Sequence, residues 1–204
     1  SNDKGLVTVS TAEEGVGNDI SQMDYFNQAL QGSTFVSNVF PSEIPLTNEM
    51  GEKELGMPTM FVSTPLKDRD GVIIGVVAIR VDEKTLNDLM LSLHLGKTGE
   101  TYLINKDGYM ITESRFAAHL KEMGVVKKRC ALELELVNPE TGEFTNGVKQ
   151  CIAGINGFNA KGYKDYSGLT VLGVWRWLPE FNWGIMAEID RDEGYGAAYN
   201  LKYI

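Results

Sequence analysis

Two stretches of the chain alternate apolar and polar side chains in the way that is typical of paired β-strands. In the first, MFVSTPLKDRDGVIIGVVAIRVDE at residues 60–83, two apolar runs surround a polar turn. In the second, at residues 163–190, the runs VLGVWRW and WGIMAEI surround a turn that carries Pro179 and Asn182. Alternation and aromatic content favour strands over helices in both. The sequence therefore predicts two β-hairpins, each followed by acidic residues and a helical pattern.

The hairpins belong to a longer internal repeat. NDKGLVTVST at residues 2–11 resembles NKDGYMITES at residues 105–114, and GVVAIRVDE resembles GIMAEIDRDE at a similar offset. A period of about a hundred residues indicates a repeated domain and not a solenoid. In the second copy ETYLIN is expected to pair with YMIT, whereas the equivalent first strand of the first copy would precede Ser1. We therefore expect a first copy at residues 1–90, truncated at its N-terminus, and a second at residues 91–204.

Helical periodicity occurs between and after the predicted strands. The segments with this pattern are residues 23–31, 83–95, 115–123 and 190–204. Gly32, Gly96 and Gly124 follow the first three and are typical helix-ending residues. The segment at residues 40–57, FPSEIPLTNEMGEKELGM, is rich in Pro and Gly and is predicted to be a loop.

Composition and charge narrow the classes of function. The chain has 204 residues, 43% of them hydrophobic, which is enough for one or two cores of about 100 residues each. A net charge of −9 argues against nucleic acid or an anionic membrane as the main partner, and the acidic balance itself needs no explanation beyond ordinary solubility. No apolar run is long enough to span a membrane. No catalytic, cofactor-binding or metal-binding motif is present, so we expect neither an enzyme nor a cofactor.

The two cysteines of the chain flank one polar segment, ALELELVNPETGEFTNGVKQ. Cys130 and Cys151 in this arrangement suit a disulfide that closes a loop in an oxidising compartment. The spacing does not match a zinc site. The alternative, two unrelated free thiols, stays open because the sequence does not measure the distance between the residues.

Four segments together resemble a known family. They are VGNDISQMDYFNQALQGSTFVS, TPLKDRDGVIIGVVAIRVD, GKTGETYLINKDGYMITESRF and KDYSGLTVLGVWRWLPEFNWGIMAEIDRDEGY. In this order they resemble the double Cache (tandem PAS-like) extracellular sensor domains of bacterial transmembrane receptors. The resemblance implies an α+β fold with two PAS-like units, each a central antiparallel sheet with flanking helices. It also implies that the membrane-distal unit, here the first copy, binds a small molecule.

The resemblance has further implications for the whole protein. It implies a periplasmic or extracellular location, in a protein held in the inner membrane by flanking helices outside this chain. It implies a homodimer formed through N-terminal helices that this chain lacks, and a cytoplasmic output module such as a histidine kinase, nucleotide cyclase, chemoreceptor module or serine/threonine kinase. The alternative is a structural or dimerisation module of the same kind of receptor that binds no ligand.

The expected ligand site lies between a helix and a sheet of the first copy. We expect Tyr25 and Phe26 to form a wall, Ser37, Ser63 and Arg80 to orient the ligand, and the loop at residues 40–57 to act as a lid. Amino-acid-binding members of the family resemble one another in an acidic residue near the position of Arg80. Because a guanidinium group pairs with carboxylates, we favour a small organic acid as the ligand.

Each of these candidate residues also has a purely structural interpretation. Tyr25 and Phe26 suit a helix core, and Arg80 suits a solvated strand position. Arg115 and Trp175 are secondary candidates, in the second copy. Arg115 equally suits a residue that holds its loop, and Trp175 suits the core, on the same strand face as Trp177.

Overall fold

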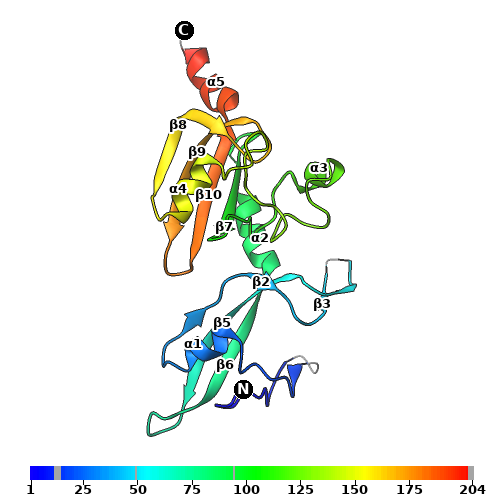
Figure 1. Ribbon diagram of the computed structural model, residues 1–204, viewed down its shortest axis with the longest axis vertical. Coiled ribbons are helices and arrows are strands. Elements are labelled where there is room, and N and C mark those ends of the chain that lie inside the picture. The colour runs from blue at the N-terminus through cyan, green and yellow to red at the C-terminus, as the bar shows by residue number, and fades with distance from the viewer. Residues whose placement is uncertain (12–14, 49, 94, 202–204) are drawn as a thin grey trace. The chain divides into compact units, whose positions relative to one another are not determined.

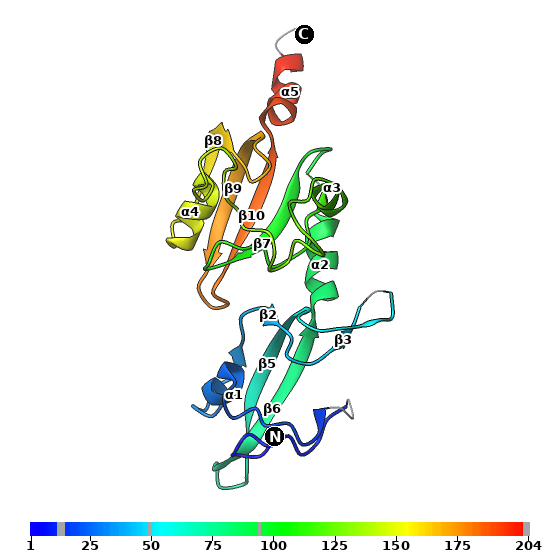
Figure 2. The same ribbon diagram turned by 45° about the vertical axis from the view of Figure 1, so that its right-hand side comes forward.

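The structure is a computed structural model that describes residues 1–11, 15–48, 50–93 and 95–201 (Figures 1 and 2). The chain divides into two compact units, which we call unit 1 (residues 1–38 and 59–82) and unit 2 (residues 39–58 and 83 onward). Each contains an antiparallel sheet, which a single described helix accompanies in unit 1 and several helices accompany in unit 2; this confirms the predicted α+β class with two sheet units. The division of the repeat at residues 1–90 and 91–204 stays a prediction.

Unit 1 is built on the first predicted hairpin. Its strands are β1 (Phe35–Val36), β5 (Pro58–Lys67, which begins at the unit boundary) and β6 (Ile73–Asp82). β5 pairs with β1 and with β6 in antiparallel register. The helix α1 (Asp24–Ala29) buries Tyr25, Phe26 and Ala29. The helix forms because this apolar pattern places the three side chains on one face, which then packs on the unit.

The two turns matched by the sequence repeat are built alike. The side-chain oxygen of Asn2 accepts the backbone N–H groups two and four residues later, at 3.0 and 2.9 Å. Asn105 does the same at 3.1 and 2.9 Å. Gly5 and Gly108 follow with φ of +88° and +78°, a conformation that favours glycine. Local chemistry therefore explains why the Asn-x-x-Gly pattern recurs in both units.

Unit 2 contains the larger sheet, with strand order β7-β10-β9-β8, all antiparallel. Its sheet strands are β7 (Glu100–Asn105), β8 (Gly157–Lys164), β9 (Thr170–Leu178) and β10 (Trp183–Asp190). Its helices are α2 (Glu83–Ser92), α3 (Ala117–Glu122), α4 (Asn146–Ile152) and α5 (Arg191–Leu201). Figures 1 and 2 show α4 lying against the sheet, where it packs on β8, β9 and β10.

The sequence predicted the strong elements and missed the weak ones. Both hairpins and the four predicted helices are found, although the helices are shorter than predicted. The predicted loop at residues 40–57 contains three short strands, β2 (Phe40–Pro41), β3 (Leu46–Thr47) and β4 (Lys53–Glu54). α4 and most of β8 were not predicted. α4 is only 7 residues long and lies in a polar segment, so its buried face gives too few positions for a periodicity.

The core of unit 2 includes both cysteines. Cys130 and Cys151 are free thiols, each with none of its surface exposed. The predicted disulfide is therefore not formed in this structure. Cys130 lies in a turn, and its backbone N–H donates to the Glu113 carboxylate. Cys151 packs against Gly184 of β10. The two residues serve as small apolar side chains in one core cluster.

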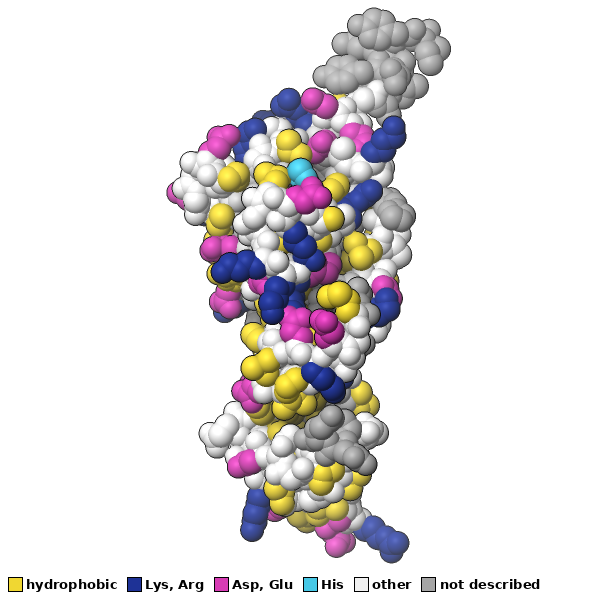
Figure 3. Space-filling view, turned by 90° about the vertical axis from the view of Figure 1, so that its right-hand side faces the viewer, with side chains coloured by type: hydrophobic (Ala, Val, Ile, Leu, Met, Phe, Trp, Pro, Cys, Tyr) yellow, Lys and Arg dark blue, Asp and Glu magenta, His cyan; other side chains and the backbone are white. Residues whose placement is uncertain are grey.

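Both units leave large apolar side chains exposed, among them Phe158 at 75% and Val174 at 53% on the sheet of unit 2. Unit 1 leaves large apolar side chains of its hairpin exposed, with Val77 at 45% and Ile79 at 64%. Figure 3 shows hydrophobic side chains at the surface of unit 1, and charged side chains of both signs dispersed over the visible face of unit 2. Within the described residues no helix is both long and apolar enough to cross a membrane.

Candidate functional site

One face of the β5–β6 hairpin brings several of the predicted site residues together. Phe61 pairs with Arg80 and Ser63 pairs with Ala78, so these side chains project from the same face of the sheet. The ring of Tyr25, from α1, stacks on the ring of Phe61 with centroids 4.3 Å apart and planes inclined by 16°. The hydroxyl of Ser63 donates to the backbone carbonyl of Tyr25. Tyr25, Ser63 and Arg80 therefore belong to one α1–sheet surface, which we call the unit 1 face.

The two serines of the predicted site are engaged with the backbone. Ser63 is fully buried, and its hydroxyl reaches the Tyr25 carbonyl at 2.6 Å. The hydroxyl of Ser37 donates to the carbonyl of Asn38 at 2.8 Å and accepts the N–H of Phe61 at 2.9 Å. These bonds fix α1 and the segment after β1 on the hairpin. The serines thus shape the unit 1 face by holding its walls.

Phe26 is 2% exposed and Tyr25 is 6% exposed, so both aromatic side chains belong largely to the core of unit 1. The core interpretation of the Tyr-Phe pair therefore holds for most of their surface. The ring of Tyr25 stacks on the ring of Phe61, and Phe61 lies directly opposite Arg80 in the β5–β6 register. The role of the pair in ligand binding stays a prediction.

Arg80 is the exposed charge of the unit 1 face. It lies on β6 directly opposite Phe61. None of the side chains that the structure describes forms an ion pair with it. A guanidinium group presents a planar fork of donors that matches a carboxylate, and it stacks well on aromatic rings. The arrangement is chemically suited to a small anion held at the rim of an aromatic wall.

The secondary candidates have structural partners in unit 2. Arg115 donates to the carbonyl of Gly99 and lies over the ring of Phe116, 5.4 Å from its centroid. Trp175 is 2% exposed, and its indole N–H donates to the carbonyl of Ile155 at 3.0 Å. These contacts correspond to the structural interpretations, in which Arg115 holds its loop and Trp175 fills the core.

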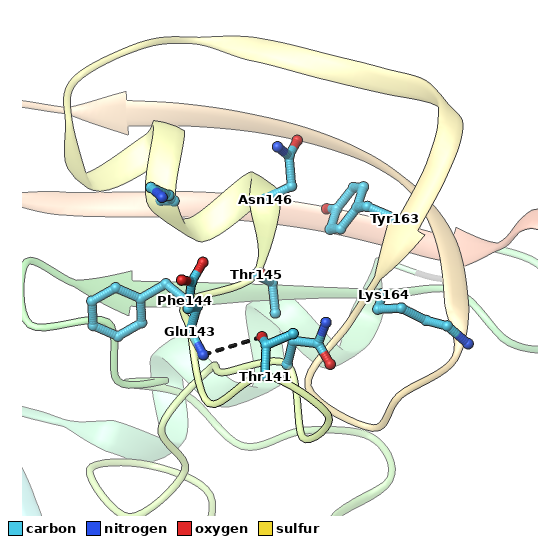
Figure 4. A pocket seen from close by; sticks show the side chains of 9 residues that line it. Thr141, Glu143, Phe144, Thr145, Asn146, Tyr163 and Lys164 are labelled. Carbon is cyan, nitrogen blue, oxygen red and sulfur yellow. Dashed lines mark hydrogen bonds between the residues drawn. The ribbon is translucent and has the colours of Figure 1, made fainter.

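Unit 2 contains a cavity that the sequence did not predict (Figure 4). It has a volume of about 290 Å³ and lies between the segment at residues 138–145, α4 and β8. Its polar lining includes Thr145, Asn146, Tyr163 and Lys164. The hydroxyl of Thr145 is buried and has no hydrogen-bond partner in the described structure. No sequence pattern indicated this cavity, because α4 and most of β8, which form two of its three walls, were not predicted.

A metal centre is not supported by the described part of the chain. Within it no group of three or more His, Cys, Asp or Glu side chains has an arrangement that could hold a metal ion.

Comparisons with known proteins agree with this architecture. The family described as a Cache domain (dCache_1) matches residues 1–198. A comparison with curated protein sequences gave no match.

Solved structures with a similar fold include three bacterial sensor domains. The periplasmic sensory domain of the Campylobacter jejuni chemoreceptor Tlp1 matches with a TM-score of 0.55 and 16% identity, over 88% of this chain and 60% of that one. The ligand binding domain of the Pseudomonas aeruginosa PAO1 amino acid chemoreceptor PctB, in complex with L-Arg, matches with a TM-score of 0.54 and 18% identity, over 91% and 62%. That of PctC, in complex with GABA, matches with a TM-score of 0.51 and 18% identity, over 89% and 66%.

The chain thus spans less than two thirds of each of these domains, and the identities make the likeness one of fold. The family match covers nearly the whole sequence and confirms the expected resemblance. The chain belongs to the Cache domain family.

Proposed function

We propose that the chain is the extracytoplasmic sensor part of a bacterial transmembrane receptor, in which the unit 1 face binds a small carboxylate-bearing molecule. Family membership supports the sensor role, since the similar domains are described as periplasmic sensory or ligand-binding domains of chemoreceptors. The signal from ligand binding would then pass through the membrane to a cytoplasmic output module, and the chain itself would act as a sensor and not as an enzyme.

The observation that carries the ligand class is the position of Arg80. Its exposed guanidinium group lies opposite Phe61, whose ring stacks on Tyr25. L-Arg and GABA, which PctB and PctC hold, each carry a carboxylate and an amine. At the strand position where amino-acid-binding members are expected to have an acidic residue, this chain has Arg80. A small organic acid without an amine therefore suits the unit 1 face best.

The test is a thermal-shift screen with named probes. Acetate, lactate, pyruvate, malate, succinate and citrate form the panel, and L-arginine and GABA are the amine-bearing comparison. A probe well above its dissociation constant is expected to raise the melting temperature of the wild type by several degrees.

Arg80→Ala is expected to abolish this shift and to leave the melting temperature without ligand nearly unchanged, because an exposed charge contributes little to stability. Arg69→Ala is the matched control, since Arg69 is an exposed arginine in the β5–β6 turn. Loss of stability in Arg80→Ala with an intact ligand response would show that Arg80 is structural and would contradict the proposed site.

A second candidate function, a structural or dimerisation module without a ligand, is favoured by one observation. Val77 and Ile79 are exposed on the strand face opposite to Arg80. Exposed apolar side chains on a sheet face are typical of an interaction surface. A wild type that no probe stabilises, together with a concentration-dependent dimer in sedimentation analysis that Ile79→Ser abolishes, would favour this function.

A further inference from the structure

Two glutamates face each other inside unit 2. Glu100 of β7 and Glu188 of β10 are directly paired in the antiparallel register, so their side chains project from the same face of the sheet. They are 6% and 3% exposed. α4 covers this face, because Gly147 of α4 lies against the Tyr163 hydroxyl and against Met186 of β10. Two carboxylates are therefore held side by side under a helix, away from water.

Hydroxyl groups satisfy all four carboxylate oxygens. Glu188 accepts from Tyr102, at 2.7 Å, and from Tyr163. Glu100 accepts from Ser114, at 2.8 Å, and from Tyr166. This set of donors holds each carboxylate in one position. Hydroxyl donors carry no charge, however, so they do not neutralise the pair.

Apart from Arg115, the groups around the pair are acidic or neutral. The titratable and charged side chains that face it come from β7, β8, the turn after β8, the loop before α3, the turn at Cys130 and α4. Besides the two glutamates they are Tyr102, Tyr163, Asp165, Tyr166, Arg115, Cys130 and Cys151. β9 faces the pair with Gly173, whose missing side chain leaves room for the Tyr163 hydroxyl. Within the described structure no Lys or Arg side chain donates to either carboxylate, and the Arg115 guanidinium is bound to the Gly99 carbonyl.

Uncompensated charge in such a place is costly. Each ionised carboxylate loses its hydration on burial, and two of them side by side repel each other. Binding one proton removes the repulsion between the two carboxylates and the desolvation cost of one of them. The hydroxyl group beside the added proton can turn to accept from it, since a hydroxyl both donates and accepts. Proton uptake is thus the simplest way for the folded protein to lower the energy of this arrangement.

The pair is linked to the C-terminal helix by short chain segments. Glu188 lies two residues before Asp190, and α5 follows at once. Glu193 of α5 accepts the N–H groups of Lys97 and Thr98, at 2.8 and 2.7 Å, just before β7 begins. The Thr98 hydroxyl in turn accepts the N–H of Asp190 at 3.2 Å. A change in the β7–β10 contact therefore acts directly on the first turn of α5.

We propose that the Glu100–Glu188 pair is a proton-binding switch, whose protonation tightens the β7–β10 contact and whose ionisation loosens it next to α5. The proposal concerns unit 2 and a proton, so it is independent of carboxylate binding by unit 1. Its input is the external pH near neutrality, and its output is the state of the first turn of α5.

The electrostatics agree with this geometry. Burial raises the pKa of Glu188 to about 7, the hydrogen bonds from Tyr163 and Tyr102 oppose the rise, and the charges of Asp165 and Glu100 add to it. Burial also raises the pKa of Glu100. A carboxyl group in an unfolded chain has a pKa of about 4.3. The stabilising effect of the Glu188 proton is therefore complete below about pH 4.3 and is lost as the pH rises through about 7.

The first test follows the melting temperature between pH 5.5 and pH 8.5. The wild type is expected to lose several degrees over this range, and Glu188→Gln, which is neutral at every pH, is expected to lose much less. Glu140→Gln is the matched control, since it removes an exposed carboxylate, and it is expected to follow the wild type. Equal pH slopes for Glu188→Gln and the wild type would overturn the proposal.

Infrared difference spectroscopy of the wild type keeps the proposal testable if Glu188→Gln does not fold. The band of a protonated carboxyl group is expected at pH 6 and is expected to disappear by pH 8.5. The absence of such a band at pH 6 would show that the pair stays ionised and would overturn the proposal.

The switch itself is tested by the backbone amides of Lys97 and Thr98, which Glu193 binds. Their resonances are expected to shift with a midpoint near pH 7. Glu193 does not account for such a midpoint, because the hydrogen bonds from Thr98 and Lys97 lower its pKa. Amides that do not respond between pH 6 and 8.5 would show that protonation stays local and that no switch operates.

Discussion

The two units differ in where their antiparallel sheets place polar and charged side chains. In unit 1 two buried polar side chains, Ser37 and Ser63, bind the backbone, and the charged side chain of Arg80 is exposed. In unit 2 two carboxylates, Glu100 and Glu188, are buried and bound by hydroxyl groups. An exposed charge beside an aromatic wall is open to a ligand, whereas a buried pair under a helix is open to little more than a proton.

The apolar cores of the two units also differ. The described apolar core of unit 1 is small and leaves Val77 and Ile79 exposed. Unit 2 buries a continuous cluster from its sheet, α3, α4 and the loops between them. A unit with few buried apolar contacts is stabilised more by a bound ligand, relative to its own stability, than a well-packed one. This difference is a physical reason to expect ligand sensing in unit 1.

The largest predicted effect comes from shortening a fully buried side chain in unit 2. Met186 of β10 is fully buried, so Met186→Ala is expected to lower the free energy of unfolding by about 2–5 kcal/mol. Val77→Ala, in the open face of unit 1, is expected to change it by less than about 0.5 kcal/mol. Urea denaturation measures both. Similar losses for the two variants would contradict the difference in packing between the units.

A smaller effect is expected from filling the space beside the acidic pair. A Cβ atom at Gly173 would collide with the Tyr163 hydroxyl, so Gly173→Ala is expected to cost about 1–3 kcal/mol. Tyr163→Phe removes that hydroxyl. The cost of Gly173→Ala is therefore expected to be smaller in a Tyr163→Phe background, as measured by a double-mutant cycle in urea. Strict additivity would mean that Gly173 does not serve to place the hydroxyl.

The smallest effect is expected for the two thiols, and this prediction concerns their chemical reactivity and not the stability of the protein. Burial raises the pKa of Cys130 to about 12 and that of Cys151 to about 11, so both stay protonated and shielded at pH 8. Iodoacetamide is expected to modify neither residue in the native protein and both in urea without a reductant, as mass spectrometry would show. If the residues in urea are modified only after a reductant is added, the two cysteines form a disulfide in the native protein, and the structure is contradicted.

The sequence predicted much of the fold because its signals are local. The hairpins follow from alternation of side chains, and the turn at Asn105 follows from an Asn-x-x-Gly pattern whose bonds lie within five residues. The acidic pair was missed although each glutamate stands in an apolar strand, in ETYLIN and in WGIMAEI. An acidic residue in a buried strand was the available signal. The register that joins Glu100 to Glu188 spans 88 positions of the chain and is not visible in either segment.

The unit 1 face shows the same limit. The period of two does not say on its own that Arg80 shares a face with Phe61, because that requires the β5–β6 register. The disulfide prediction failed for a related reason. It was inferred from the polar segment between the cysteines, whereas α4 and the turn at Cys130 fold that segment so that both thiols point into a core.

The central claim, that the two units have different chemical tasks, is tested most directly by amide spectra of the ¹⁵N-labelled wild type. The carboxylate probe with the largest thermal shift is titrated in at constant pH. The account predicts shifts confined to α1, β5 and β6 of unit 1, including the amides of Phe61 and Arg80, and saturation at one equivalent. Shifts centred instead on α4, β8 and the cavity of Figure 4 would place the ligand in unit 2 and contradict the account.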